Sequence, residues 1–130
     1  MARSTGRPLS PHLTIWRWGP AMALSILHRA TGDGLAVVGG LAVVWWLVAA
    51  ASGSESYATF MWVATSWVGY VFMIGLTWAF IEHLLSGLRH LVLDIGAGYE
   101  LKTNRTWALA IPVLAIALTA LIWLYVLVGK

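Results

Sequence analysis

Three long apolar segments constrain the fold of this chain more than any other feature. They cover roughly residues 32–51, 59–86 and 107–128. A helix rises about 1.5 Å per residue, so each segment is long enough to cross a hydrocarbon core about 30 Å thick. Transmembrane strands would need polar and apolar residues to alternate over about ten positions, whereas these segments are apolar on all sides. The sequence therefore predicts an all-α integral membrane protein with three transmembrane helices.

The overall composition agrees with a membrane location. Hydrophobic residues make up 60% of the 130 residues and charged residues only 10%, which is too apolar for a soluble domain of this size. There is no internal repeat or low-complexity tract. We therefore expect residues 1–130 to form a single membrane domain.

Basic side chains gather on one side of the predicted membrane. They precede the first span and lie between the second and third, whereas the connection 52–58 holds only Glu55. The positive-inside rule then predicts a cytoplasmic N-terminus. The net charge of +3 follows from this topology and gives no support to nucleic-acid binding. With no recognisable secretory signal or organellar transit peptide, the inner membrane of a bacterium is the simplest location.

Aromatic residues mark the expected membrane boundaries. Residues 1–20 are polar and carry Trp16 and Trp18, which suits a segment lying in the headgroup region. Pro20 is acceptable in a first helical turn, so the first helix is expected to run from about residue 21 to 51. Other tryptophans fall near the ends of the spans, as an interfacial belt would: Trp45, Trp46, Trp62, Trp67, Trp107 and Trp123.

Glycines recur in the first helix, at positions 32, 34, 39 and 40. In membrane helices, small residues mark close approach to a neighbouring helix or to a flat cofactor. Helix packing is the simpler interpretation here. A dinucleotide-binding loop is excluded because no strand precedes these glycines and they lie within an apolar run.

His83 is an ionisable residue inside the second apolar segment. It lies six residues before Arg89, which is expected to mark the inner boundary, so its ring is on the order of 9 Å inside the membrane. Such groups are costly and tend to be functional. Gly87, one turn later on the same face, would leave room for a planar macrocycle, and membrane-buried b-type haem needs axial nitrogens. A neutral histidine bonded to a neighbouring helix explains His83 equally well.

Two residues near His83 have less certain roles from the sequence alone. His90 falls about two turns later on nearly the same face, at the boundary, where solvation or a salt bridge is the simpler interpretation and contact with a haem carboxylate the alternative. Glu82 points about 100° away from His83. Near the end of a membrane helix its carboxylate could reach water or a partner chain, and the sequence does not determine its role.

A polar group also occupies the start of the first helix. Ser25 and Arg29 are four residues apart and share a face, with His28 on its flank. A hydroxyl and a guanidinium presented together can donate hydrogen bonds to a quinone carbonyl, or the guanidinium can hold a propionate. Alternatively, Arg29 extends to lipid phosphates.

Several classes of chemistry are excluded. The chain has no cysteine, so it cannot supply thiolate ligands to an iron–sulfur cluster. It has no nucleophile–base pair, zinc-binding motif or P-loop. The remaining expectation is electron transfer.

Two segments resemble the family of large cytochrome b subunits of succinate dehydrogenase. One is Arg7-Pro-Leu-Ser-Pro-His-Leu-Thr-Ile15, followed by Trp18 and by Pro20-Ala-Met-Ala-Leu-Ser25-Ile-Leu-His28-Arg29-Ala-Thr-Gly32. The other is His83-x-x-x-Gly87-x-Arg89-His90-Leu-x-x-Asp94. Trp16 stands where a tyrosine is frequent in the family. The resemblance covers essentially the whole chain.

The resemblance implies a single membrane-anchor domain within succinate:quinone oxidoreductase, inactive on its own. Its expected partners are a small membrane anchor subunit, an iron–sulfur subunit and a flavoprotein subunit, which carry the flavin and the clusters. His83 is implied as an axial ligand to the iron of haem b, with the other histidine on the small anchor. The resemblance places His28 and Arg29 at the haem propionates, and contact of His90 with a propionate stays the alternative that its position on the helix allows. It places Ser25, Arg29 and Trp18 at the ubiquinone site.

Two alternative hypotheses remain from the sequence. The chain could be a self-contained cytochrome b that uses His28 and His83, both its own, as ligands. It could instead be a haem-free membrane scaffold.

Overall fold

The structure is a computed structural model that describes residues 14–129. Its elements follow in the order α1 (Pro20–Gly34), η1 (Leu35–Gly39), α2 (Gly40–Ala51), α3 (Ser54–Ala64), α4 (Trp67–Asp94) and α5 (Leu101–Val128). Three helices are long and apolar enough to cross a membrane: Pro20–Ala51, Trp67–Asp94 and Leu101–Val128. The all-α, three-span prediction is confirmed.

The first spanning helix consists of α1, η1 and α2. It begins at Pro20, after an extended Gly19, as the first-turn position of the proline predicts. η1 is a single π-helical turn placed between Gly34 and Gly40, so the helix continues through it without a break. Residues 14–19 are not helical, and residues 1–13 of the predicted interfacial segment lie outside the described residues.

The predicted second span, 59–86, is wrong at both ends. Residues 54–64 form the separate helix α3, entered through Gly53, whose φ of 107° favours glycine. The chain then breaks at Thr65–Ser66, where the Ser66 hydroxyl accepts a hydrogen bond from the Gly69 N–H at 3.1 Å and starts α4. An apolar run conceals such a break because the cap is a single polar residue.

The other end of α4 and the start of α5 were also predicted too short. α4 continues eight residues past Ser86 to Asp94, and α5 begins at Leu101 rather than near residue 107. The added turns carry several charged and polar residues, and a side-chain hydrogen bond between Arg89 and Asn104 joins them. The apolar pattern therefore located the membrane part of each helix and not its full length.

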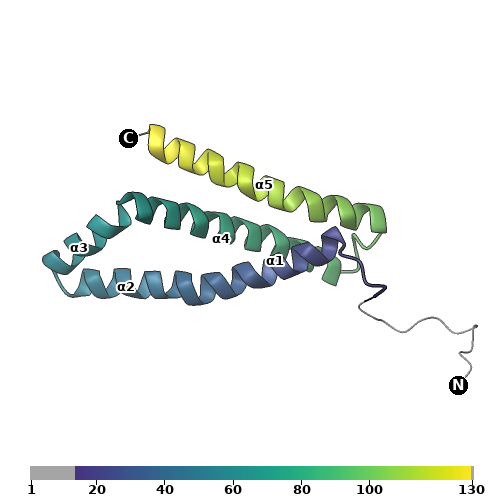
Figure 1. The fold of residues 1–130 in the computed structure, drawn as a ribbon, viewed down its shortest axis with the longest axis horizontal. Helices are drawn as coiled ribbons and strands as arrows, with labels where there is room; N and C mark the ends of the chain where they lie inside the picture. The colour runs from purple at the N-terminus through teal and green to yellow at the C-terminus, as the bar shows by residue number, and fades with distance from the viewer. Residues whose placement is uncertain (1–13, 130) are drawn as a thin grey trace, which may run out of the picture.

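The helices pack at one end of the molecule and separate at the other. Figure 1 shows α1, α4 and α5 converging near the N-terminal segment, while α2 and α4 diverge and α3 closes the gap between them. The apolar core lies at the converging end and is small: Leu24, Ala108 and Ile111, with Ala21 and Leu85 against them. Most other apolar side chains are exposed, as expected where lipid or a second membrane subunit is the surroundings.

Candidate functional site

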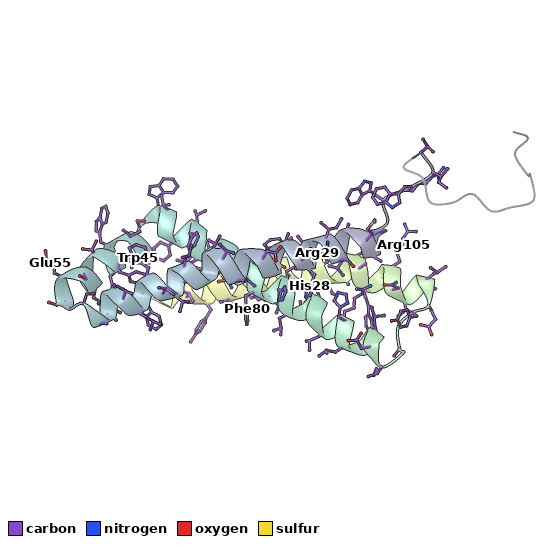
Figure 2. All side chains as sticks on the ribbon, turned by 90° about the horizontal axis from the view of Figure 1, so that it is seen from below. His28, Arg29, Trp45, Glu55, Phe80 and Arg105 are labelled. Carbon is purple, nitrogen blue, oxygen red and sulfur yellow. The ribbon has the colours of Figure 1, made fainter. Side chains whose placement is uncertain are left out.

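Three histidines gather where α1 crosses α4. His28 comes from α1, and His83 and His90 come from α4. The rings of His28 and His83 are stacked, with centroids 4.1 Å apart and 7° between their planes, and His90 lies 5.0 Å from His28. Figure 2 shows His28 at this crossing, on the half of the molecule that also carries Arg29 and Arg105. The cluster therefore brings together the two sequence segments, around His28 and around His83, that resemble the same family.

Gly32 makes the close approach of the two helices possible. A Cβ atom at this position would lie only 2.7 Å from Cε1 of His83, closer than real contacts allow. The helix-packing interpretation therefore holds for Gly32. Gly34 and Gly40 have open space around them, so they have no such role in the described part of the chain.

Gly87 borders the histidine cluster from the other helix. A Cβ atom there would lie 3.7 Å from Nε2 of His28, an ordinary van der Waals distance. The prediction that this glycine leaves room for a macrocycle stays a prediction. What the contact does establish is that the free space beside Gly87 adjoins His28.

The hydrogen bonds of His83 determine which ring nitrogen is free. Nδ1 lies 3.0 Å from the backbone oxygen of His28 and 3.4 Å from the hydroxyl of Thr31. A carbonyl oxygen only accepts, so Nδ1 carries the proton in this bond. In a neutral imidazole, Nε2 is then left with its lone pair, which is the state a metal ligand requires. The residues present thus fit ligation of an iron by His83.

A buried carboxylate lies beside this histidine. Glu82 is 0% exposed and accepts hydrogen bonds from Thr31 at 3.0 Å and from Ser86 at 2.8 Å. The sequence left the role of Glu82 open, and in the structure its carboxylate is shielded from water and bonded within the chain. The 100° offset from His83 directs its side chain to Thr31 of α1, which also contacts Nδ1 of His83.

Thr31 and Ser86 complete a hydrogen-bond network around Glu82, and the sequence patterns did not indicate either residue. Both are buried, at 5% and 0% exposure. One signal was available, because Ser86 follows Glu82 by four residues and so shares its helix face. The partner on the other helix, Thr31, carried no such signal.

His28 carries an unsatisfied nitrogen. Its Nε2 is buried and has no hydrogen-bond partner within the described residues. Buried polar atoms are nearly always paired in native proteins, because a lost hydrogen bond to water must be replaced. A polar group from outside this chain is therefore expected at Nε2.

The remaining predicted site residues lie outside the cluster. Ser25 is exposed and donates a hydrogen bond to the backbone oxygen of Ala21. Arg29 is exposed and has no ion pair within residues 14–129. Trp18 is 67% exposed, its ring 4.8 Å from that of Trp16. The structure does not enclose these three side chains in a pocket of this chain.

Arg89, which is expected at the inner boundary of the membrane, is buried between two helices and only 5% exposed. Its Nη2 donates to the side-chain oxygen of Asn104 near the start of α5, and its Nε is buried without a partner. The side chain thus joins α4 to α5.

Comparison with known proteins gives a consistent result. Residues 3–122 match the family described as the succinate dehydrogenase/fumarate reductase transmembrane subunit. A succinate dehydrogenase cytochrome b556 subunit of Paracoccus denitrificans is 46% identical over 96 residues, 74% of this chain and 73% of the relative. The subunit of the same name from Rickettsia prowazekii is 35% identical over 90% of both chains. A mitochondrial cytochrome b560 subunit of Mus musculus is 37% identical over 87% of this chain and 68% of its own length.

Proposed function

This chain belongs to the succinate dehydrogenase/fumarate reductase transmembrane subunit family, and on that premise we propose that it binds haem b together with a small anchor subunit and helps to form the site of ubiquinone reduction. Electrons from succinate arrive through the flavoprotein and iron–sulfur subunits. The flavin and the clusters belong to those subunits, so this chain is inactive alone.

The observation that carries the proposal is the hydrogen bond between Nδ1 of His83 and the backbone oxygen of His28. It fixes the tautomer that leaves Nε2 available, as in metal sites where the second ring nitrogen is held by a backbone carbonyl. When bound, haem b supplies a one-electron redox centre. His83 would hold its iron from this chain, and the small anchor would supply the other histidine.

The unsatisfied Nε2 of His28 supports a contact with the haem carboxylates. This nitrogen is buried beside His83 and 5.0 Å separates the His28 ring from that of His90. Arg29 follows directly in the chain and has no carboxylate partner among the described residues. His28, Arg29 and His90 together offer donors to an anionic propionate.

The exposure of Ser25, Arg29 and Trp18 supports a quinone site completed by other subunits. The hydroxyl and the guanidinium are one helical turn apart on α1 and face outward. Their hydrogen bonds to quinone oxygens become stronger as negative charge develops there during reduction. Trp18 provides an aromatic wall.

The distribution of charge supports a cytoplasmic N-terminus in a bacterial inner membrane. Figure 2 shows Arg29 and Arg105 in the half of the molecule opposite the end that holds Glu55. Lys102 is near Arg105 at the start of α5. The positive-inside rule assigns the basic end to the cytoplasm, where the soluble subunits would dock.

The stacked geometry argues against the self-contained cytochrome b. In a bis-histidine site the two rings approach the iron from opposite faces of the macrocycle. His28 and His83 are instead face to face at 4.1 Å, with no macrocycle-sized space between them. The second ligand is therefore expected on the partner.

Replacing His83 with alanine in the assembled complex tests the ligand assignment. We expect the subunits to co-purify while the reduced-minus-oxidised spectrum of haem b disappears. His90→Ala is the comparison on the same helix: it removes a proposed propionate contact and no ligand, so the complex should retain haem with weaker binding. Full haem content in the His83→Ala complex would remove His83 as a ligand and favour a different pair of histidines. A wild-type complex that contains no haem would favour the haem-free scaffold.

A further inference from the structure

A buried cation without a negative partner lies between α4 and α5. Arg89 is 5% exposed, one of its nitrogens donates to Asn104, and its Nε has no acceptor. Within residues 14–129, no carboxylate is close enough to form an ion pair with it. A buried charge left uncompensated in a membrane protein is strongly unfavourable. An anion from outside this chain is therefore expected at Arg89.

An apolar cavity adjoins this cation. Its volume is about 300 Å³, and Arg89 is the only charged residue in its lining, among side chains such as Leu88, Trp107 and Ile111. A second cavity of about 500 Å³ shares Ala110 and Leu114 with the first and continues along α5 to Ala117. We call the two cavities together the α4–α5 groove. It has a positive charge at one end and apolar walls along its length.

The depth of the charged end matches that of lipid headgroups. Arg89 lies five residues before the end of α4, about 7.5 Å along the helix axis. Asn104, its partner, is in the first turn of α5, where Lys102 and Arg105 are exposed. Trp107 is at the depth where amphipathic aromatic rings accumulate. The groove thus begins at the membrane boundary and extends along α5 towards the membrane interior.

We propose that the α4–α5 groove binds one anionic phospholipid, with its phosphate on Arg89 and one acyl chain along the apolar walls. The phosphate supplies the missing negative charge, and the guanidinium offers several donors to its oxygens. The acyl chain accounts for the apolar length of the groove, which an inorganic anion would leave unfilled. Cavities of about 300 to 1,000 Å³ are of a size for small ligands.

This lipid site is distinct from the histidine cluster. Arg89 follows His83 by six residues, so the two side chains point about 120° apart around the axis of α4. His83 contacts α1, whereas Arg89 contacts α5. The inference therefore does not depend on the haem or quinone assignments.

The test compares four variants of the assembled complex by native mass spectrometry, with quantification of the extracted phospholipid. Arg89→Gln removes the charge, Arg89→Lys keeps it, and Ala110→Leu fills the groove while Arg89 is unchanged. Arg105→Gln removes an exposed charge at the same end as a matched control. We expect the loss of one tightly bound anionic phospholipid per chain in Arg89→Gln and Ala110→Leu, and retention in Arg89→Lys and Arg105→Gln.

A second measurement distinguishes a lipid from a free anion or a protein partner. Phosphatidylglycerol added to the delipidated complex should raise the unfolding temperature of the wild type and of Arg105→Gln, but not of Arg89→Gln or Ala110→Leu. Phosphatidylcholine and inorganic phosphate should have no such effect. The proposal is overturned if inorganic phosphate alone stabilises the complex. It is also overturned if Arg89→Gln releases a partner subunit while the count of bound anionic lipid is unchanged.

Discussion

The imidazole of His83 stacks on that of His28, with ring centroids 4.1 Å apart and planes 7° from parallel. Nδ1 of His83 also donates a hydrogen bond to the backbone oxygen of His28. This double contact joins α1 to α4 at the histidine cluster. The conformation of His83 therefore depends on α1 as much as on its own helix.

Gly32→Ala should weaken haem retention without removing any ligand. The new methyl group would lie 2.7 Å from Cε1 of His83, so the ring or the helix must shift. Overpacking of this kind costs about 1–3 kcal/mol. Haem content and thermal unfolding of the purified complex measure the effect. Gly34→Ala is the matched control, because nothing lies within 4 Å of its added methyl group. Equal behaviour of the two variants would contradict the close contact.

Thr31→Val should destabilise the α1–α4 contact at nearly constant volume. It removes the donor to Glu82 and the hydroxyl beside Nδ1 of His83. A buried acceptor left without its donor costs about 1–3 kcal/mol, and loss of an outer partner of a metal ligand typically weakens metal binding about 10–100-fold. Chemical unfolding and haem titration are the measurements. Thr106→Val, at an exposed hydroxyl that bonds its own helix, should change stability by less than about 0.5 kcal/mol.

Ser25→Ala and Arg29→Lys should impair ubiquinone reduction and leave succinate oxidation by an artificial acceptor unchanged. Each removes a hydrogen bond that is stronger in the transition state, so kcat/KM for ubiquinone should fall about tenfold or more. Lysine does not replace the planar donor pair of arginine. Steady-state kinetics with both acceptors check this. Normal ubiquinone kinetics in both variants would exclude these side chains from the quinone site.

Trp123→Phe should affect stability and not the haem. The indole nitrogen of Trp123 donates to the Thr77 hydroxyl at 3.1 Å, which ties α5 to α4 away from the histidine cluster. Such bonds inside membranes contribute about 0.6 kcal/mol on average. A double-mutant cycle with Thr77→Val measures the coupling, and the haem spectrum should be unchanged throughout. A coupling near zero would show that the bond is not formed in the complex.

The ends of the helices show where sequence patterns lose information. The apolar run across residues 59–86 gave no sign that Ser66 starts a new helix. The polar residues from His83 to Asp94 suggested a boundary, although the helix continues through them. Hydropathy reports the surroundings of a side chain and not the conformation of its backbone, so it misplaces helix ends.

The buried polar network shows a second limit. The sequence left the role of Glu82 open and placed Arg89 at the membrane boundary, and both side chains are at most 5% exposed. Their partners, Thr31 and Asn104, lie on other helices, 51 and 15 residues away in the chain. No local pattern specifies such a pairing.

The number of membrane-spanning helices, the basic end of the bundle and the unusual position of His83 can be derived from the amino-acid sequence, because apolar length, charge and a polar group in an apolar run are local properties. The stacking of His83 on His28, the bond of Glu82 to Thr31 and the burial of Arg89 beside a groove are visible only in the folded chain. These contacts depend on how α1, α4 and α5 are rotated about their own axes. Packing of side chains across helices sets that rotation, with Gly32 admitting the closest approach.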